Sequence, residues 1–103
     1  MSLEQLLAHE AYDFETITVS TTAVGLTGAK VQPSDAAPAK AAYMTVAGAD
    51  IRYRYDGTDP TASVGHLLKD GNAIRLAGVN NLRNFNAIRD AAVDATLTVT
   101  FER

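Results

Sequence analysis

The densest set of local structural signals in this chain lies in ADIRYRYDGTDPTASVGHLLKDG, residues 49–71. Ile51, Tyr53 and Tyr55 alternate with two arginines, so one face of an extended segment is large and apolar and the other carries two guanidinium groups. This alternation is typical of a half-buried strand, and it predicts that both tyrosines lie in the core. The two arginines are expected to form local ion pairs with neighbouring aspartates rather than to bind an anion.

Turn signals follow this strand. Asp-Gly pairs are typical of turns because glycine adopts positive φ without steric cost, and Asp-Pro fixes a bend because the residue before proline avoids the helical region. The predicted turn formers are Asp56, Gly57, Asp59, Pro60, Asp70 and Gly71. Residues 65–68 predict a short strand that ends in a hairpin turn at Asp70-Gly71. The spacing of the aspartates does not match an EF-hand loop, so we predict no metal site.

Further strands are predicted where β-branched and aromatic residues alternate with polar ones. They cover residues 14–22, 42–47, 73–77, 85–89 and 95–102. The last has the cleanest alternation and is expected to be central, and residues 24–26 are expected to continue the first strand after a kink. We therefore predict an all-β fold, a small antiparallel β-sandwich or barrel of seven to eight short strands with a short N-terminal helix or arm.

The apolar positions of these strands define the expected core. It consists of Ile17, Val19, Met44, Val46, Ile51, Tyr53, Tyr55, Ile74, Leu76, Leu97, Val99 and Phe101. Residues 27–40, rich in Gly, Pro and Ala, are expected to form a long surface loop that is either a contact region or a mobile connection. Residues 78–84 are expected to form an irregular loop with Leu82 as its anchor.

The N-terminus carries a second kind of pattern. Leu3, Leu6 and Leu7 recur at spacings of three and four, which is typical of a short amphipathic helix. Such a helix is marginal alone, so it packs on its own domain or docks onto a neighbouring subunit as an assembly interface, unless the segment is disordered. We divide the chain into an N-terminal helix or arm, residues 1–13, and a β-sandwich domain, residues 14–103, which is expected to fold without the arm.

The composition limits the classes of function. The 103 residues suffice for one small domain, and 47% apolar with 20% charged residues is an ordinary globular composition. A net charge of -3 gives no electrostatic reason to expect binding to nucleic acid or to an anionic membrane. Without cysteine, neither disulfides nor cysteine-ligated zinc can stabilise the fold. No signal peptide or membrane span is predicted, so the chain is expected not to be secreted.

Signatures of catalysis are not found in the sequence. His9 and His66 do not form a His-x-x-x-His pair, and there is neither a serine elbow nor a phosphate-binding glycine loop. Both histidines are interpreted as structural or solvated. We therefore predict no catalytic residues, no cofactor and no enzymatic activity.

Three segments together form a recognisable pattern: IRYRYDGTDPT at 51–61, Gly65-His66, and DATLTVTFER at 94–103. This pattern is similar to a run of the form I-R-Y-R-x-D-G-x-x-P-T, a glycine turn and a final threonine-rich strand in short β-rich virion structural proteins of tailed bacteriophages. The resemblance covers the C-terminal half of the chain. It implies a capsid decoration or head-tail or tail accessory protein without enzymatic activity, made in the host cytoplasm, localised in the virion and assembled with other virion proteins.

Two functions remain open at this point. The first is a non-enzymatic phage virion structural protein, a capsid decoration (cement) or accessory component that forms a homo-oligomer and acts by protein–protein assembly. The alternative is a small carbohydrate- or ligand-binding β-module, because tyrosines are suitable stacking surfaces. The tyrosines are Tyr12, Tyr43, Tyr53 and Tyr55. The prediction that Tyr53 and Tyr55 face the core weighs against the alternative.

Overall fold

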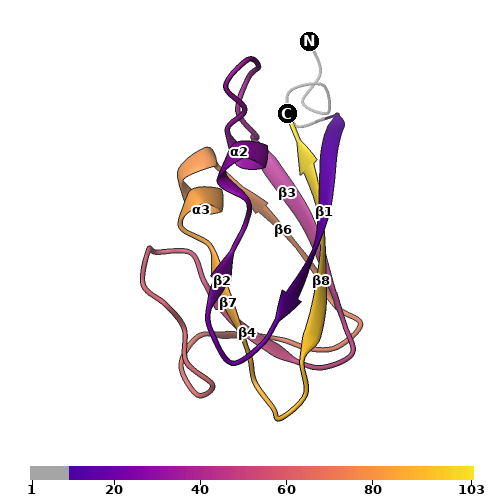
Figure 1. Cartoon of the computed structure of the whole chain (residues 1–103), viewed down its shortest axis with the longest axis vertical. Helices are drawn as coiled ribbons and strands as arrows, with labels where there is room; N and C mark the ends of the chain where they lie inside the picture. Colours follow the sequence, from indigo (N-terminus) through magenta and orange to yellow (C-terminus); the bar gives the residue numbers. More distant parts are fainter. Residues whose placement is uncertain (1–9) are drawn as a thin grey trace.

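Eight antiparallel strands form two four-stranded sheets in the computed structural model, which describes residues 10–103 (Figure 1). Sheet 1 has the order β1-β8-β3-β6, formed by Ala11–Val19, Ala95–Glu102, Ala41–Ala47 and Ala73–Ala77. Sheet 2 has the order β2-β7-β4-β5, formed by Val24–Gly25, Asn86–Arg89, Ile51–Arg54 and His66–Leu68. The predicted all-β class, the antiparallel pairing and the number of strands are confirmed.

Strand β8 is central to sheet 1, as its alternation predicted. It lies between β1 and β3 and pairs with both over most of its length. Leu97, Val99 and Phe101 are buried on one side, whereas the threonines between them point to the other side. The strand therefore separates a core-facing surface from an outer surface of sheet 1.

The core combines side chains from both sheets and from the segments between them. The largest fully buried side chains are Phe85, Phe101, Met44, Ile51, Leu82, Leu97, Val19, Val31, Val46 and Val99. The predicted core is confirmed for its buried members, while Ile17, Tyr53, Ile74 and Leu76 are half-buried and pack against it. The prediction for Tyr55 is wrong: β4 ends at Arg54, so the alternation stops and the Tyr55 ring is exposed.

Two connections cross between the sheets where the sequence predicted local continuity. Val24 lies in β2 of sheet 2 and pairs with β7, so it does not prolong β1. At the other crossing, a hydrogen bond of 2.9 Å from the Asn72 N–H to the Lys69 carbonyl closes a tight turn. The predicted hairpin at Asp70-Gly71 is nevertheless wrong, because β5 pairs with β4 and β6 pairs with β3.

Two one-turn helices lie beside the core, α2 at Gly28–Val31 and α3 at Val79–Arg83 (Figure 1). The predictions of a long loop at residues 27–40 and of an irregular loop at residues 78–84 are therefore wrong where these helices lie. Val31 and Ala39 anchor the 27–40 segment: both are buried, and the Ala39 N–H donates to the Val31 carbonyl at 2.7 Å. Leu82 anchors α3 in the same way.

No helix within residues 10–103 is long and apolar enough to cross a membrane.

The first strand begins earlier than predicted. β1 starts at Ala11, and Glu10 and Arg103 exchange two main-chain hydrogen bonds of 3.0 Å. Residues 10–13 therefore belong to the β-sandwich, and the predicted boundary at residue 14 moves towards the N-terminus. The reason is the ring of Tyr12, which packs against the core and lies 6.4 Å from the ring of Phe101. The predicted helix and its assembly residues Leu3, Leu6 and Leu7 lie outside the described residues, so they stay a prediction.

Candidate functional site

The outer surface of sheet 1 is rich in threonine, and we call it the threonine face. Its members are Phe14, Thr16, Thr18, Tyr43, Thr45, Thr96, Thr98 and Thr100. Direct cross-strand pairs such as Phe14 with Thr100 and Thr16 with Thr98 place these side chains on one side of the sheet. Phe14 and Tyr43 are large apolar groups that remain exposed on this face.

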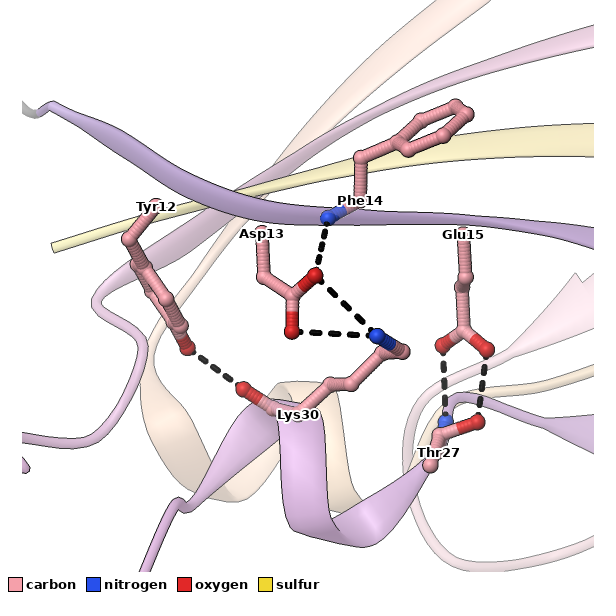
Figure 2. A network of polar contacts seen from close by, with 6 residues as sticks. All are labelled: Tyr12, Asp13, Phe14, Glu15, Thr27 and Lys30. Atoms are coloured by element: carbon pink, nitrogen blue, oxygen red, sulfur yellow. Dashed lines mark hydrogen bonds and ion pairs between the residues drawn. The ribbon is translucent and has the colours of Figure 1, made fainter. Parts of the chain in front are cut away.

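A β-bulge at Tyr12 decides which side chains of β1 reach the threonine face. Asp13 pairs with Phe101 although Ala11 already pairs with Glu102, so Tyr12 is an extra residue and both Tyr12 and Asp13 point towards α2. Figure 2 shows Tyr12, Asp13 and Glu15 reaching the segment that contains α2, while Phe14 points to the opposite side. The exposure of Phe14 therefore follows from the strand geometry.

Tyr12, Asp13 and Glu15 of β1 form hydrogen bonds to the segment that contains α2. The Tyr12 hydroxyl donates to the Lys30 carbonyl at 2.5 Å, and the Lys30 ammonium donates to both Asp13 carboxylate oxygens at 3.0 Å (Figure 2). The Glu15 carboxylate accepts hydrogen bonds from the main-chain N–H and the hydroxyl of Thr27 at 2.9 and 2.6 Å. These contacts fix the α2 segment against β1, so β1 presents a defined outer surface.

The threonine face carries little charge. Arg75 of β6 and Glu102 of β8 form an ion pair of 3.1 Å, and the Arg75 guanidinium lies 5.5 Å from the centroid of the Tyr43 ring. One carboxylate oxygen of Glu102 accepts from Arg75, and the other is buried without a hydrogen-bond partner. The face therefore offers apolar and hydroxyl groups to a partner, with its charges balanced.

A second exposed feature lies at the end of sheet 2 and consists of stacked rings. Phe85 is buried, Tyr53 stacks on it with ring centroids 5.7 Å apart, and His66 lies 5.3 Å from Tyr53. Tyr55 continues the stack at 6.4 Å from Tyr53 and 6.0 Å from His66. The pairing of Tyr53 with His66 across β4 and β5 places both rings on one side of the sheet. The rings thus lead from the core to the solvent.

An open pocket of about 590 Å³ adjoins these rings, and we call it the aromatic pocket. Its lining residues are Arg54, Tyr55, Asp56, Val64, Gly65 and His66. One wall is a tight turn at residues 61–64, in which the Thr61 N–H donates to the Val64 carbonyl at 2.9 Å and the Thr61 hydroxyl oxygen accepts from the Val64 N–H at 3.0 Å. The pocket is formed by structured main chain.

Charged groups of the aromatic pocket are paired. Arg54 donates two hydrogen bonds to the Asp56 carboxylate, at 3.1 and 2.5 Å, and this contact lowers the pKa of Asp56 and raises the pKa of Arg54. Arg52, two residues earlier in β4, donates to the Asp90 carboxylate at 2.8 Å and to the Gly65 carbonyl at 3.1 Å. The predicted local ion pair is confirmed for Arg54, whereas it is wrong for Arg52, whose partner Asp90 is distant in sequence. Burial raises the pKa of the Tyr53 hydroxyl.

The predicted turn formers lie in two places. Asp56, Gly57, Asp59 and Pro60 follow β4: Gly57 has a φ of 86°, Asp59 is exposed and Pro60 is buried. Asp70 and Gly71 lie between β5 and β6, where the Asp70 carboxylate accepts from the Gly48 N–H at 3.0 Å and Gly71 has a φ of 87°. Of these residues, the structure brings only Asp56 into the aromatic pocket. Within residues 10–103, no three His, Cys, Asp or Glu side chains gather closely enough to hold a metal ion.

The aromatic pocket was missed by sequence reasoning because it depends on strand pairing. The signal in the sequence was a Tyr-x-Tyr pair followed by a histidine beside a glycine, but only the β4–β5 register places His66 against Tyr53.

The comparisons with known proteins add no family to this description: the chain matches no protein-family model, no curated protein and no solved structure.

Proposed function

We propose that this chain is a non-enzymatic structural protein of a tailed-phage particle, a capsid decoration or accessory component, and that it acts by protein–protein assembly. The observation that carries the assembly role is the threonine face, a broad sheet surface with two exposed aromatic rings and balanced charge. The virion context is supported by the resemblance of residues 51–61, 65–66 and 94–103 to short phage structural proteins.

The partner that best fits the threonine face is a second copy of this chain. The whole chain has a net charge of -3, so most orientations of two copies are opposed by electrostatic repulsion. The threonine face avoids this cost, because its charged neighbours Arg75 and Glu102 neutralise each other. A symmetric contact through the same surface of each copy is the commonest arrangement of homo-oligomers.

The size of the face determines the strength of this contact. Four strands spaced by about 4.8 Å and about seven residues of 3.3 Å each give an area of about 440 Å². Two copies would therefore bury roughly 900 Å², close to the lower limit of about 1,000 Å² for a specific interface. One such contact is weak, so stable attachment to a particle requires several copies acting together.

A matched pair of variants tests the face. Phe14 is 57% exposed on the threonine face, and Val93 is 59% exposed in the β7–β8 connection. Light scattering over a range of concentrations should show a dimer or larger assembly for the wild type and for Val93→Asp, and a shift to monomer for Phe14→Asp. A wild type that stays monomeric, or equal assembly by both variants, would contradict the proposal. Circular dichroism checks that each variant is folded.

A further inference from the structure

The side chains of the aromatic pocket lie outside the threonine face, so the proposed assembly does not account for them. Phe85 and the inner part of Tyr53 complete the core, but Tyr55 and His66 extend beyond it and remain exposed. The planes of Tyr53 and Tyr55 are inclined by 22°, and those of Tyr55 and His66 by 23°. An exposed aromatic ring provides a flat face on which another flat group can stack.

Two charged side chains, Arg54 and Asp56, lie beside the exposed rings in the aromatic pocket. The Asp56 carboxylate and the Arg54 guanidinium line the same pocket and are joined by two hydrogen bonds. The guanidinium has five N–H donors and the carboxylate has about four acceptor positions, so each keeps hydrogen-bonding capacity after pairing. Paired donors and acceptors next to aromatic rings suit a ligand with several hydroxyl groups and an apolar C–H face.

The charged groups of the aromatic pocket do not favour an anionic ligand. Arg54 is the cation that lines the pocket, and Asp56 already neutralises it. An isolated anion or a nucleic-acid backbone would therefore gain little from Arg54 and would meet a chain with a net charge of -3. A neutral polyhydroxyl ring avoids both costs.

The pocket is largely formed without a ligand. Gly65 has a φ of 141°, and a Cβ atom there would lie 3.1 Å from Pro60 Cβ and 3.1 Å from the Tyr53 carbonyl oxygen. The chain at Gly65 is thus closely packed against β4, next to the turn that presents Val64. A volume of about 590 Å³ is within the range of small-molecule sites, roughly 300 to 1,000 Å³.

We infer that the aromatic pocket binds a neutral saccharide, with the C–H face of a pyranose ring stacked on Tyr55 and His66 and its hydroxyl groups bonded to Arg54 and Asp56. The C–H groups carry partial positive charge and are attracted to the negative face of an aromatic ring. This site is in sheet 2 and does not involve the threonine face, so its existence does not depend on the assembly proposal.

The test uses three neutral trisaccharides, maltotriose, cellotriose and chitotriose, titrated separately into the ¹⁵N-labelled full chain. At least one should shift the amide signals of Gly65 and His66 in a saturable way. Tyr55→Ala should weaken that binding about tenfold, the loss expected for one stacked ring. The matched control is Val93→Ala, because Val93 is exposed and lies outside both the threonine face and the aromatic pocket. Val93→Ala should leave the affinity unchanged.

Several results would overturn the inference. One is the lack of any saturable shift at Gly65 or His66 with all three sugars. Another is equal affinity of the Tyr55→Ala variant and the wild type. A third is salt-dependent binding of a thymidine oligonucleotide at the same residues without sugar binding, which would identify single-stranded nucleic acid as the ligand.

Discussion

The hydroxyl group of Tyr12 donates a hydrogen bond of 2.5 Å to the main-chain carbonyl of Lys30. This bond connects the bulge of β1 to α2, two elements that the sequence places in separate segments (Figure 2). The Arg103 guanidinium lies 4.1 Å from the centroid of the same ring. Tyr12 therefore joins the beginning of the sandwich, its α2 segment and the C-terminal residue.

Tyr12→Phe should lower the free energy of unfolding by about 0.5–1.5 kcal/mol, because it removes this hydrogen bond and keeps the ring. Burial raises the pKa of the Tyr12 hydroxyl, which keeps it protonated as a donor. Urea denaturation of both proteins measures the difference. Tyr43→Phe is the control, since Tyr43 is exposed on the threonine face. Equal losses in the two variants would contradict the role of the Tyr12 hydroxyl.

The ion pair between Asp13 and Lys30 predicts a dependence of stability on pH. The Asp13 carboxylate accepts hydrogen bonds from the Lys30 ammonium and from the Phe14 N–H, and these bonds, that from Lys30 most of all, lower the pKa of Asp13 below the ordinary value of 3.8. A lowered pKa in the folded state means that the pair stabilises the fold above pH 3.8 and that this contribution is lost as the pH falls through the folded-state pKa.

Asp13→Asn should therefore be less stable than the wild type at neutral pH, and the difference should shrink as the pH is lowered below 3.8. Thermal unfolding of both proteins across this range measures the effect. A difference that stays constant down to the most acidic pH would show that Asp13 acts through shape rather than through its charge.

Two truncated proteins, one lacking residues 1–13 and one lacking residues 1–9, test whether residues 10–13 belong to the domain. Removal of residues 1–13 should destabilise the domain by about 3 kcal/mol, because it deletes the packing of Tyr12, its hydrogen bond and the Glu10–Arg103 pairing. Removal of residues 1–9 alone should leave the β signal and the unfolding midpoint nearly unchanged. Comparable midpoints for the two truncated proteins would contradict the placement of residues 10–13 in the domain.

Neighbouring substitutions in β8 test its register. Val99→Asp should unfold the domain, because it buries an unpaired charge in the core. Thr98→Asp puts the same charge on the outer side of the strand and should leave the fold intact. Circular dichroism and near-ultraviolet spectra distinguish the two outcomes. A folded, soluble Val99→Asp protein would show that β8 has another register.

Strand alternation predicted the parts of the fold that depend on neighbouring residues. The threonines and apolar residues of 95–102 specified a central strand, and Ala73–Ala77 was predicted with its observed bounds. The sheet partner of each strand depends on distant residues, so alternation gave no sign that β2 and β5 belong to sheet 2. The same limit explains Tyr55, whose exposure depends on where the pairing of β4 ends.

The candidate sites differ in how far the sequence revealed them. Alternating threonines in β1 and β8 already indicated a polar outer face, but the exposure of Phe14 depends on the bulge at Tyr12. The aromatic pocket needed the pairing of Tyr53 with His66 and the turn at residues 61–64, neither of which has a local signal strong enough to predict a site.

The most direct test of the proposed function is quantitative mass spectrometry of purified phage particles encoding either the wild-type chain or Phe14→Asp. The wild-type chain should be present in a fixed ratio to the shell protein, whereas Phe14→Asp should be depleted from particles while remaining folded and soluble in the lysate. Absence of the wild-type chain from purified particles, or equal retention of the Phe14→Asp variant, would contradict assembly through the threonine face.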